Sequence, residues 1–204
     1  MADLAGYYPN NPAPVSVEVK TVTPSTTTNT LSGKTFRLAY GGQFYEASLT
    51  YTSMTLRTMR PLQGFISQAY GPTFSFEVVF PEVSYSTSIN PPSTTVRTNG
   101  AVAKGVKSVT LENCGASKEV LNGGDYFKFA NHSKVYQATN QCLSDGAGNA
   151  TLYFAGSLTA NVPDNTNLTI TAVPFTMIFA SSDQTTSTGI GGISTFEVKM
   201  REVW

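Results

Sequence analysis

The stretch from Gly123 to Asn140, GGDYFKFANHSKVYQATN, carries the clearest structural signal in the chain. Phe127 and Phe129 alternate with more polar neighbours, and a period of two places apolar side chains on one face of a strand. Polar turn formers follow at 130–133, and residues 134–140 then resume with types that suit a half-buried strand. Two short strands joined by a tight loop predict a β-hairpin.

Alternation on both sides of this hairpin extends the β pattern. Gly41 and Gly42 predict a two-residue turn that joins two of these strands in a second hairpin. The proline-rich segment 1–14 is expected to be an extended arm, and residues 23–32 and 185–194 are expected to be polar loops. The glycines of 185–194 lack the strand–turn–helix setting of a dinucleotide fingerprint. Strands are predicted at 15–20, 34–40, 43–51, 74–80, 108–111, 126–129, 134–141, 150–154, 168–172, 175–180 and 196–204.

One helix is predicted, over residues 58–70. Thr58 can cap its N-terminus, and Pro61 falls in the first turn, where a missing N–H costs nothing. Gly71 and Pro72 end it. Its apolar face is formed by residues at helical spacing, namely Leu62, Phe65, Ile66 and Ala69.

A shift to Ser, Thr, Asn and Pro over residues 84–99, with Pro91-Pro92 at its centre, indicates a boundary between modules. Residues 1–92 and 176–204 are predicted to form one discontinuous module, because the helix and strand 74–80 need a sheet that the C-terminal strand can complete. Residues 93–175 are predicted to form an inserted barrel, since about five strands in about 70 residues suit a small closed one. The fold class is therefore mainly β with one short helix.

Charge is scarce in this chain. Charged residues make up 13% of it, and 13 basic residues balance 13 acidic ones, whereas an average soluble domain is about 25% charged. The scattered lysines cannot hold a phosphate backbone, which excludes nucleic-acid recognition. No basic stretch precedes an apolar run, and no window approaches 18 apolar residues, so neither a signal peptide nor membrane insertion is expected. Such a surface suits burial against other protein.

The residues that could carry chemistry do not form a catalytic pattern. His132 lies beside Ser133 without a strand-to-helix elbow and is expected to be a solvated or backbone-bonded turn residue. Asp145 with Asn149 lacks the alternating acids of a calcium loop. Cys114 and Cys142 are expected to be unpaired, partly buried thiols, with a bridge as the alternative. No catalytic residue, cofactor or metal site is predicted. A glycosidase would need a pair of acids, and no such pair can be located, because most of the candidate carboxylates occur singly on strands. The candidates are Glu46, Glu77, Glu82 and Glu112.

Tyrosines provide the candidate contact residues. Tyr7 and Tyr8 lie between prolines and are expected to find no local core, so they are predicted, with Trp204, to contact a neighbouring subunit. Three barrel tyrosines could instead form an aromatic platform for sugar, although half-buried packing is the preferred interpretation. They are Tyr126, Tyr136 and Tyr153.

The opening stretch also resembles the distal tail protein family of long-tailed, siphovirus-type bacteriophages, in the version with an inserted barrel of the oligonucleotide/oligosaccharide-binding type. The residues that carry the resemblance are Gly124-Asp125, Phe127-Lys128, His132, Lys134-Val135-Tyr136 and Thr139-Asn140. The rest of the chain is similar in layout rather than in letters, and residues 1–30 show no match.

The resemblance implies a tail-type β-sandwich or split-barrel module with the OB-like barrel inserted. It further implies a non-enzymatic virion component of the tail tip or baseplate, made in the host cytoplasm. In this family the outer module forms a homohexameric ring that joins the tail tube protein to the hub and fibre proteins. A carbohydrate-binding module for attachment to the host surface remains the alternative.

Overall fold

The computed structural model describes residues 4–39, 42–181, 187–188 and 193–204. The chain divides into two compact units, one built from 1–21, 45–81 and 174–204 and the other from 22–44 and 82–173. The predicted class, mainly β with one short helix, is confirmed. Most of the predicted loop 185–194 lies outside the described residues.

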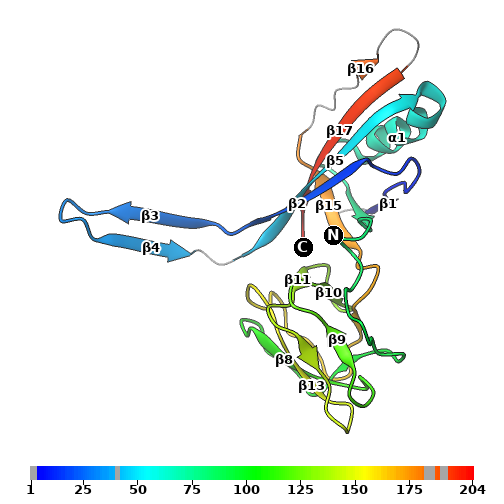
Figure 1. Cartoon of the computed structure of the whole chain (residues 1–204). Helices are drawn as coiled ribbons and strands as arrows, with labels where there is room; N and C mark the ends of the chain where they lie inside the picture. The colour runs from blue at the N-terminus through cyan, green and yellow to red at the C-terminus, as the bar shows by residue number, and fades with distance from the viewer. Residues whose placement is uncertain (1–3, 40–41, 182–186, 189–192) are drawn as a thin grey trace. The chain divides into compact units, whose positions relative to one another are not determined.

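A seven-stranded sheet forms the first unit (Figure 1). Its order is β1-β6-β15-β17-β5-β2, with β16 paired to β17, and only β1 and β6 run parallel among the pairs with a described register. The strands are β1 (Leu4–Tyr7), β2 (Ser16–Val22), β5 (Phe44–Thr55), β6 (Ser75–Val78), β15 (Phe175–Phe179), β16 (Ser187–Thr188) and β17 (Ile193–Glu202).

Alternation assigns the two faces of this sheet opposite roles. Ala47 pairs with Met200, and Leu49 pairs with Val198; all four side chains are buried. The residues between them on β5 and β17 are polar or charged and point to the other face. Helix α1 (Leu56–Ala69) packs on the apolar face, where Phe65 meets Phe76 of β6 edge to face.

The helix differs from its prediction at the N-terminus. It begins at Leu56, and its N-cap is Thr55, which makes no side-chain capping bond. Thr58 lies inside the helix, where its hydroxyl bonds the Thr55 hydroxyl at 3.0 Å. Pro61 therefore lies past the first turn, so its lost N–H is not free of cost.

A small closed barrel forms most of the second unit, and all five strands predicted for it overlap observed ones. Its strand order is β7-β8-β13-β11-β10-β14, and two isolated bridges close the circle, Ala138 to Phe154 and Arg97 to Asn167. A separate two-stranded sheet is formed by β9 and β12. The strands are β7 (Arg97–Thr98), β8 (Ser108–Glu112), β9 (Glu119–Leu121), β10 (Tyr126–Phe129), β11 (Val135–Gln137), β12 (Cys142–Leu143), β13 (Ala150–Tyr153) and β14 (Leu168–Thr169).

The predicted pairing of strand 34–40 with strand 43–51 across Gly41-Gly42 is wrong, and residues 40–41 of the turn itself lie outside the described residues. The strand β4 (Thr35–Ala39) pairs with β3 (Ser25–Asn29), a segment expected to be loop, whereas β5 pairs with β17 and β2. The apolar side chains of β5 enter the core of the first unit, which outweighs local pairing with β4. The signal for β3 was its run of threonines, because β-branched residues favour strands.

Segments 22–44 and 82–92 belong to the second unit, although the predicted division placed both in the first module. Two buried carboxylates bind segment 82–92 to the barrel. Asp125 accepts hydrogen bonds from the Ser86 hydroxyl at 2.7 Å and from the Thr87 N–H and hydroxyl. Glu119 accepts one from the Ile89 N–H at 2.8 Å. With these contacts, the boundary that was predicted after residue 92 falls after Pro81.

Candidate assembly surfaces

His132 is held by side chains in the turn between β10 and β11. Its Nδ1 lies 2.9 Å from the Asn131 side-chain oxygen, and its Nε2 lies 2.9 Å from the Tyr136 hydroxyl. Burial, and then the charges of Lys128 and Lys134, lower its pKa to about 4. The expected solvated or backbone-bonded turn residue is thus a half-buried one bonded by side chains. The arrangement orients a neutral imidazole toward the barrel core, with both ring nitrogens occupied.

The other side chains that could carry chemistry are either hydrogen-bonded within a loop or buried. Asp145 accepts hydrogen bonds from the N–H groups of Ala147 and Asn149, which hold the pKa of its carboxyl below the usual range. Cys114 and Cys142 are free and buried, and burial raises their pKa values to about 11 and about 12. Within the described ranges, no group of three or more His, Cys, Asp or Glu side chains could hold a metal ion.

The three barrel tyrosines do not form one platform. Tyr136 is buried in the barrel core, where its hydroxyl accepts a hydrogen bond from the Thr159 N–H at 3.0 Å. It cannot face a glycan, because its strand position points inward beside Phe127. Tyr126 is half-buried on the outer face, and burial raises its pKa. Only Tyr153 is well exposed, at 52%.

The expectation that Tyr8 finds no local core is also wrong. Its side chain is only 4% exposed, its ring packs on Phe65 and Phe76, and its hydroxyl bonds that of Tyr51 at 3.2 Å. Pairing of β1 with β6 brings it there. Tyr7 and Trp204 are exposed, and their contact with a neighbouring subunit stays a prediction.

The β3–β4 hairpin is the surface that sequence reasoning missed (Figure 1). Every residue of both strands is exposed. Register places Phe36 opposite Thr28 and Leu38 opposite Thr26, so these four side chains share one face. Phe36 and Leu38 are 54% and 59% exposed. The opposite face carries only polar residues and Ala39, which makes this an amphipathic hairpin. On its apolar face the Lys34 ammonium lies 5.2 Å from the centre of the Phe36 ring, and both apolar side chains still stay more than half exposed.

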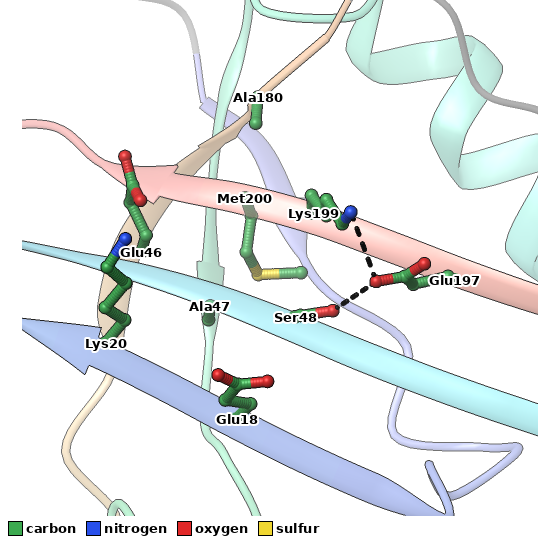
Figure 2. Close-up of a pocket in the computed structure, with 9 residues that line it drawn as sticks. All are labelled: Glu18, Lys20, Glu46, Ala47, Ser48, Ala180, Glu197, Lys199 and Met200. Atoms are coloured by element: carbon green, nitrogen blue, oxygen red, sulfur yellow. Dashed lines mark hydrogen bonds and ion pairs between the residues drawn. The ribbon is translucent and has the colours of Figure 1, made fainter.

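The polar face of the first unit's sheet forms a second open surface, with a hollow of about 360 Å³ (Figure 2). Ser48 donates a hydrogen bond to Glu197 at 2.9 Å, and Lys199 lies 3.4 Å from the same carboxylate oxygen. The Ser48 bond, and then Lys199, lower the pKa of Glu197. Glu18 and Lys20 continue the pattern along β2. Charges of both signs suit a protein partner of mixed charge rather than a polyanion.

Comparison with models of known protein families gives no match, and comparison with curated proteins gives none either. Among the described helical residues, none forms a helix both long and apolar enough to cross a membrane.

Proposed function

We propose that this chain is a structural component of a phage tail tip or baseplate, where copies form a ring that joins the tail tube to the hub and fibres. The proposal that copies assemble rests on the exposed apolar face of the β3–β4 hairpin. A two-stranded hairpin is marginally stable in water without a further layer to bury one face. A neighbouring copy provides that layer when it covers Phe36 and Leu38.

Charge supports assembly from a second direction. A chain with no formal net charge has no self-repulsion to keep copies apart. The open sheet face adds charges of both signs in an exposed row. Exposed ion pairs contribute little, at most about 1 kcal/mol each, so apolar contact and backbone pairing provide most of the stability of the ring.

A non-enzymatic role fits the way the candidate groups are occupied. The His132 nitrogens bond Asn131 and Tyr136, and Asp125 and Glu119 bind the backbone and side chains of 86–89. The ring size of six, the tail tube, hub and fibre partners and the place in the virion tail rest on the resemblance of residues 124–140 to the distal tail family.

Light scattering and negative-stain imaging of the full chain test the proposal. The wild-type protein should form closed rings, and the double variant Phe36→Ser/Leu38→Ser should be monomeric with an unchanged unfolding midpoint. The control Thr27→Ala/Arg37→Gln alters the polar face of the same hairpin and should still form rings. Salt at about 1 M shortens the Debye length to about 3 Å and should leave the rings intact.

Two outcomes contradict the proposal. If the wild-type protein stays monomeric at high concentration, the proposed ring does not form. If the Phe36→Ser/Leu38→Ser variant forms rings as well as the wild type does, the β3–β4 hairpin is not the contact between subunits.

A further inference from the structure

Asparagine is followed by glycine at two places in the chain, Asn99-Gly100 and Asn122-Gly123. In such a pair the glycine nitrogen can attack the side-chain carbonyl carbon, Cγ, of the asparagine, because glycine has no Cβ to hinder the approach. The asparagine then loses its side-chain nitrogen as ammonia. Nothing in the two dipeptides separates them, so a difference in their reactivity has to come from the fold.

The fold brings the backbone nitrogen of Gly123 to the side chain of Asn122. The Gly123 N–H donates a hydrogen bond to the Oδ1 atom of Asn122 at 2.8 Å. The Cγ atom is bonded to that oxygen at about 1.2 Å, so the attacking nitrogen and its target are close neighbours. The same hydrogen bond polarises the carbonyl group and makes its carbon more electrophilic. Both residues are exposed, so water can reach the site.

The Asn99-Gly100 pair is held differently. The Gly100 N–H donates to the Asp164 carboxylate at 2.7 Å, so the nitrogen faces Asp164 and not the side chain of Asn99. The main chain of Asn99 is fixed as well, because its N–H donates to the Thr110 carbonyl oxygen at 2.9 Å and its carbonyl oxygen accepts from the Thr110 hydroxyl at 2.6 Å. A hydrogen bond to a charged group is a strong one, and it must break before the Gly100 nitrogen can attack.

We propose that Asn122 is a site of spontaneous deamidation and that the fold protects Asn99 from the same reaction. The Gly123 nitrogen forms a bond to Cγ of Asn122, and the bond from Cγ to Nδ2 breaks. Nδ2 leaves as ammonia, together with the proton that the Gly123 nitrogen gives up. Water then opens the cyclic imide at either of its carbonyl carbons, which leaves aspartate or isoaspartate at position 122. The reaction needs no enzyme, oxidant or reductant, and it does not depend on ring assembly.

The modification has a structural consequence, because Asn122 begins the turn that leads into β10. The Asp125 N–H donates to the Asn122 carbonyl oxygen at 3.2 Å, and the Asn122 N–H donates to the Asp125 carboxylate at 2.9 Å. Aspartate adds a second negative charge to this turn, and like charges repel. Isoaspartate adds a carbon to the main chain beside Gly123, where a Cβ would already lie 3.4 Å from the Thr139 carbonyl oxygen. Either product should loosen the turn and, through Asp125, the attachment of segment 86–89.

Peptide mapping by mass spectrometry tests the proposal on the full-length protein, incubated at mildly alkaline pH to favour loss of the proton from the attacking nitrogen. In the folded protein, Asn122 should deamidate at least about tenfold faster than Asn99, because only the Asn99-Gly100 pair must first break a charge-assisted bond. In urea, where neither pair keeps its partners, the two rates should be similar. Equal rates in the folded protein, or a difference that persists unchanged in urea, would overturn the proposal.

Two variants test the causes separately. Asp164→Ala frees the Gly100 N–H and should raise the rate at Asn99 without changing the rate at Asn122. An unchanged rate at Asn99 in this variant would contradict its protection by Asp164. Asn122→Gln keeps a side-chain amide but lengthens the side chain, so attack would form a larger ring and position 122 should stay intact.

The unfolding midpoint after the same incubation measures the structural consequence. It should fall in the wild type and stay unchanged in Asn122→Gln. Equal falls in the two proteins would show that deamidation at position 122 does not loosen the turn.

Discussion

Two hairpins in this chain share the same local construction and differ in what covers them. In the β10–β11 hairpin, Phe127, Phe129 and Tyr136 are buried in the barrel core. In the β3–β4 hairpin, Phe36 and Leu38 stay more than half exposed. Both are antiparallel pairs with one apolar face. The difference shows that alternation predicts which face of a strand is apolar, but not whether the same chain supplies the cover.

The largest expected effect compares one substitution in both hairpins. Phe127→Ala should lower the free energy of unfolding by about 3–5 kcal/mol, because it leaves a cavity in a closed core. Phe36→Ala should change the unfolding of the monomer by less than about 0.5 kcal/mol, because no core is lost. Urea denaturation of both variants at low protein concentration measures this contrast. Similar losses in the two would mean that the β3–β4 hairpin is covered within its own chain.

The polar support of the barrel hairpin comes next. Asp125→Ala removes the acceptor for Ser86, Thr87 and Asn122 just before β10. The loss of hydrogen bonds to a charged acceptor should lower the free energy of unfolding by about 1.5–3 kcal/mol. The donors themselves are half-buried or exposed and can bond water in the variant. Hydrogen exchange at the Thr87 amide should rise as well. Asp164→Ala, in an exposed turn, is the control and should cost far less. An unchanged unfolding midpoint in Asp125→Ala would show that 86–89 is held by other contacts.

A substitution with a smaller expected effect shows whether the N-terminal segment is covered by its own chain, as the β10–β11 hairpin is, or left exposed, as the β3–β4 hairpin is. Tyr8→Phe keeps the packed ring and removes the hydroxyl bond to Tyr51, so it should cost about 1 kcal/mol. Tyr7→Phe, at an exposed position, should have no measurable effect. Deletion of residues 1–14 should then destabilise the first unit itself. A deletion that weakens only assembly would place this segment with the exposed hairpin.

The smallest expected effect depends on pH and tests the turn of the barrel hairpin. The pKa of His132 is about 4 in the folded chain and about 6.5 when unfolded. Between those values the unfolded chain binds a proton that the folded one does not, so stability should fall as pH drops from about 6.5 toward 4. Because the ring is only half-buried, the loss should be under about 1 kcal/mol.

Unfolding midpoints of the wild type and of His132→Gln, measured from pH 7.5 to 4.5, check this prediction. The variant should lose that part of the pH slope. Equal slopes in the two proteins would show that His132 titrates normally in the folded state.

The amino-acid sequence by itself determined the features that depend on neighbours along the chain. Alternation of apolar residues located the strands around Phe127 and Phe76, and apolar spacing located the helix around Leu62 and Phe65. The low charge argued against nucleic-acid recognition, and the lack of a catalytic pattern among His132, Ser133 and the carboxylates argued against catalysis. These conclusions need only the periods of a helix and a strand.

The tertiary structure decided what depends on residues far apart in the chain. It paired β5 with β17 instead of β4, buried Tyr8 under α1, and turned Tyr136 into the barrel. It also paired Thr110 of β8 with Thr151 of β13, two residues far apart in the sequence. Each outcome depends on which apolar faces find a shared core. That competition is global, so a local pattern can name the face that must be covered but not the segment that covers it.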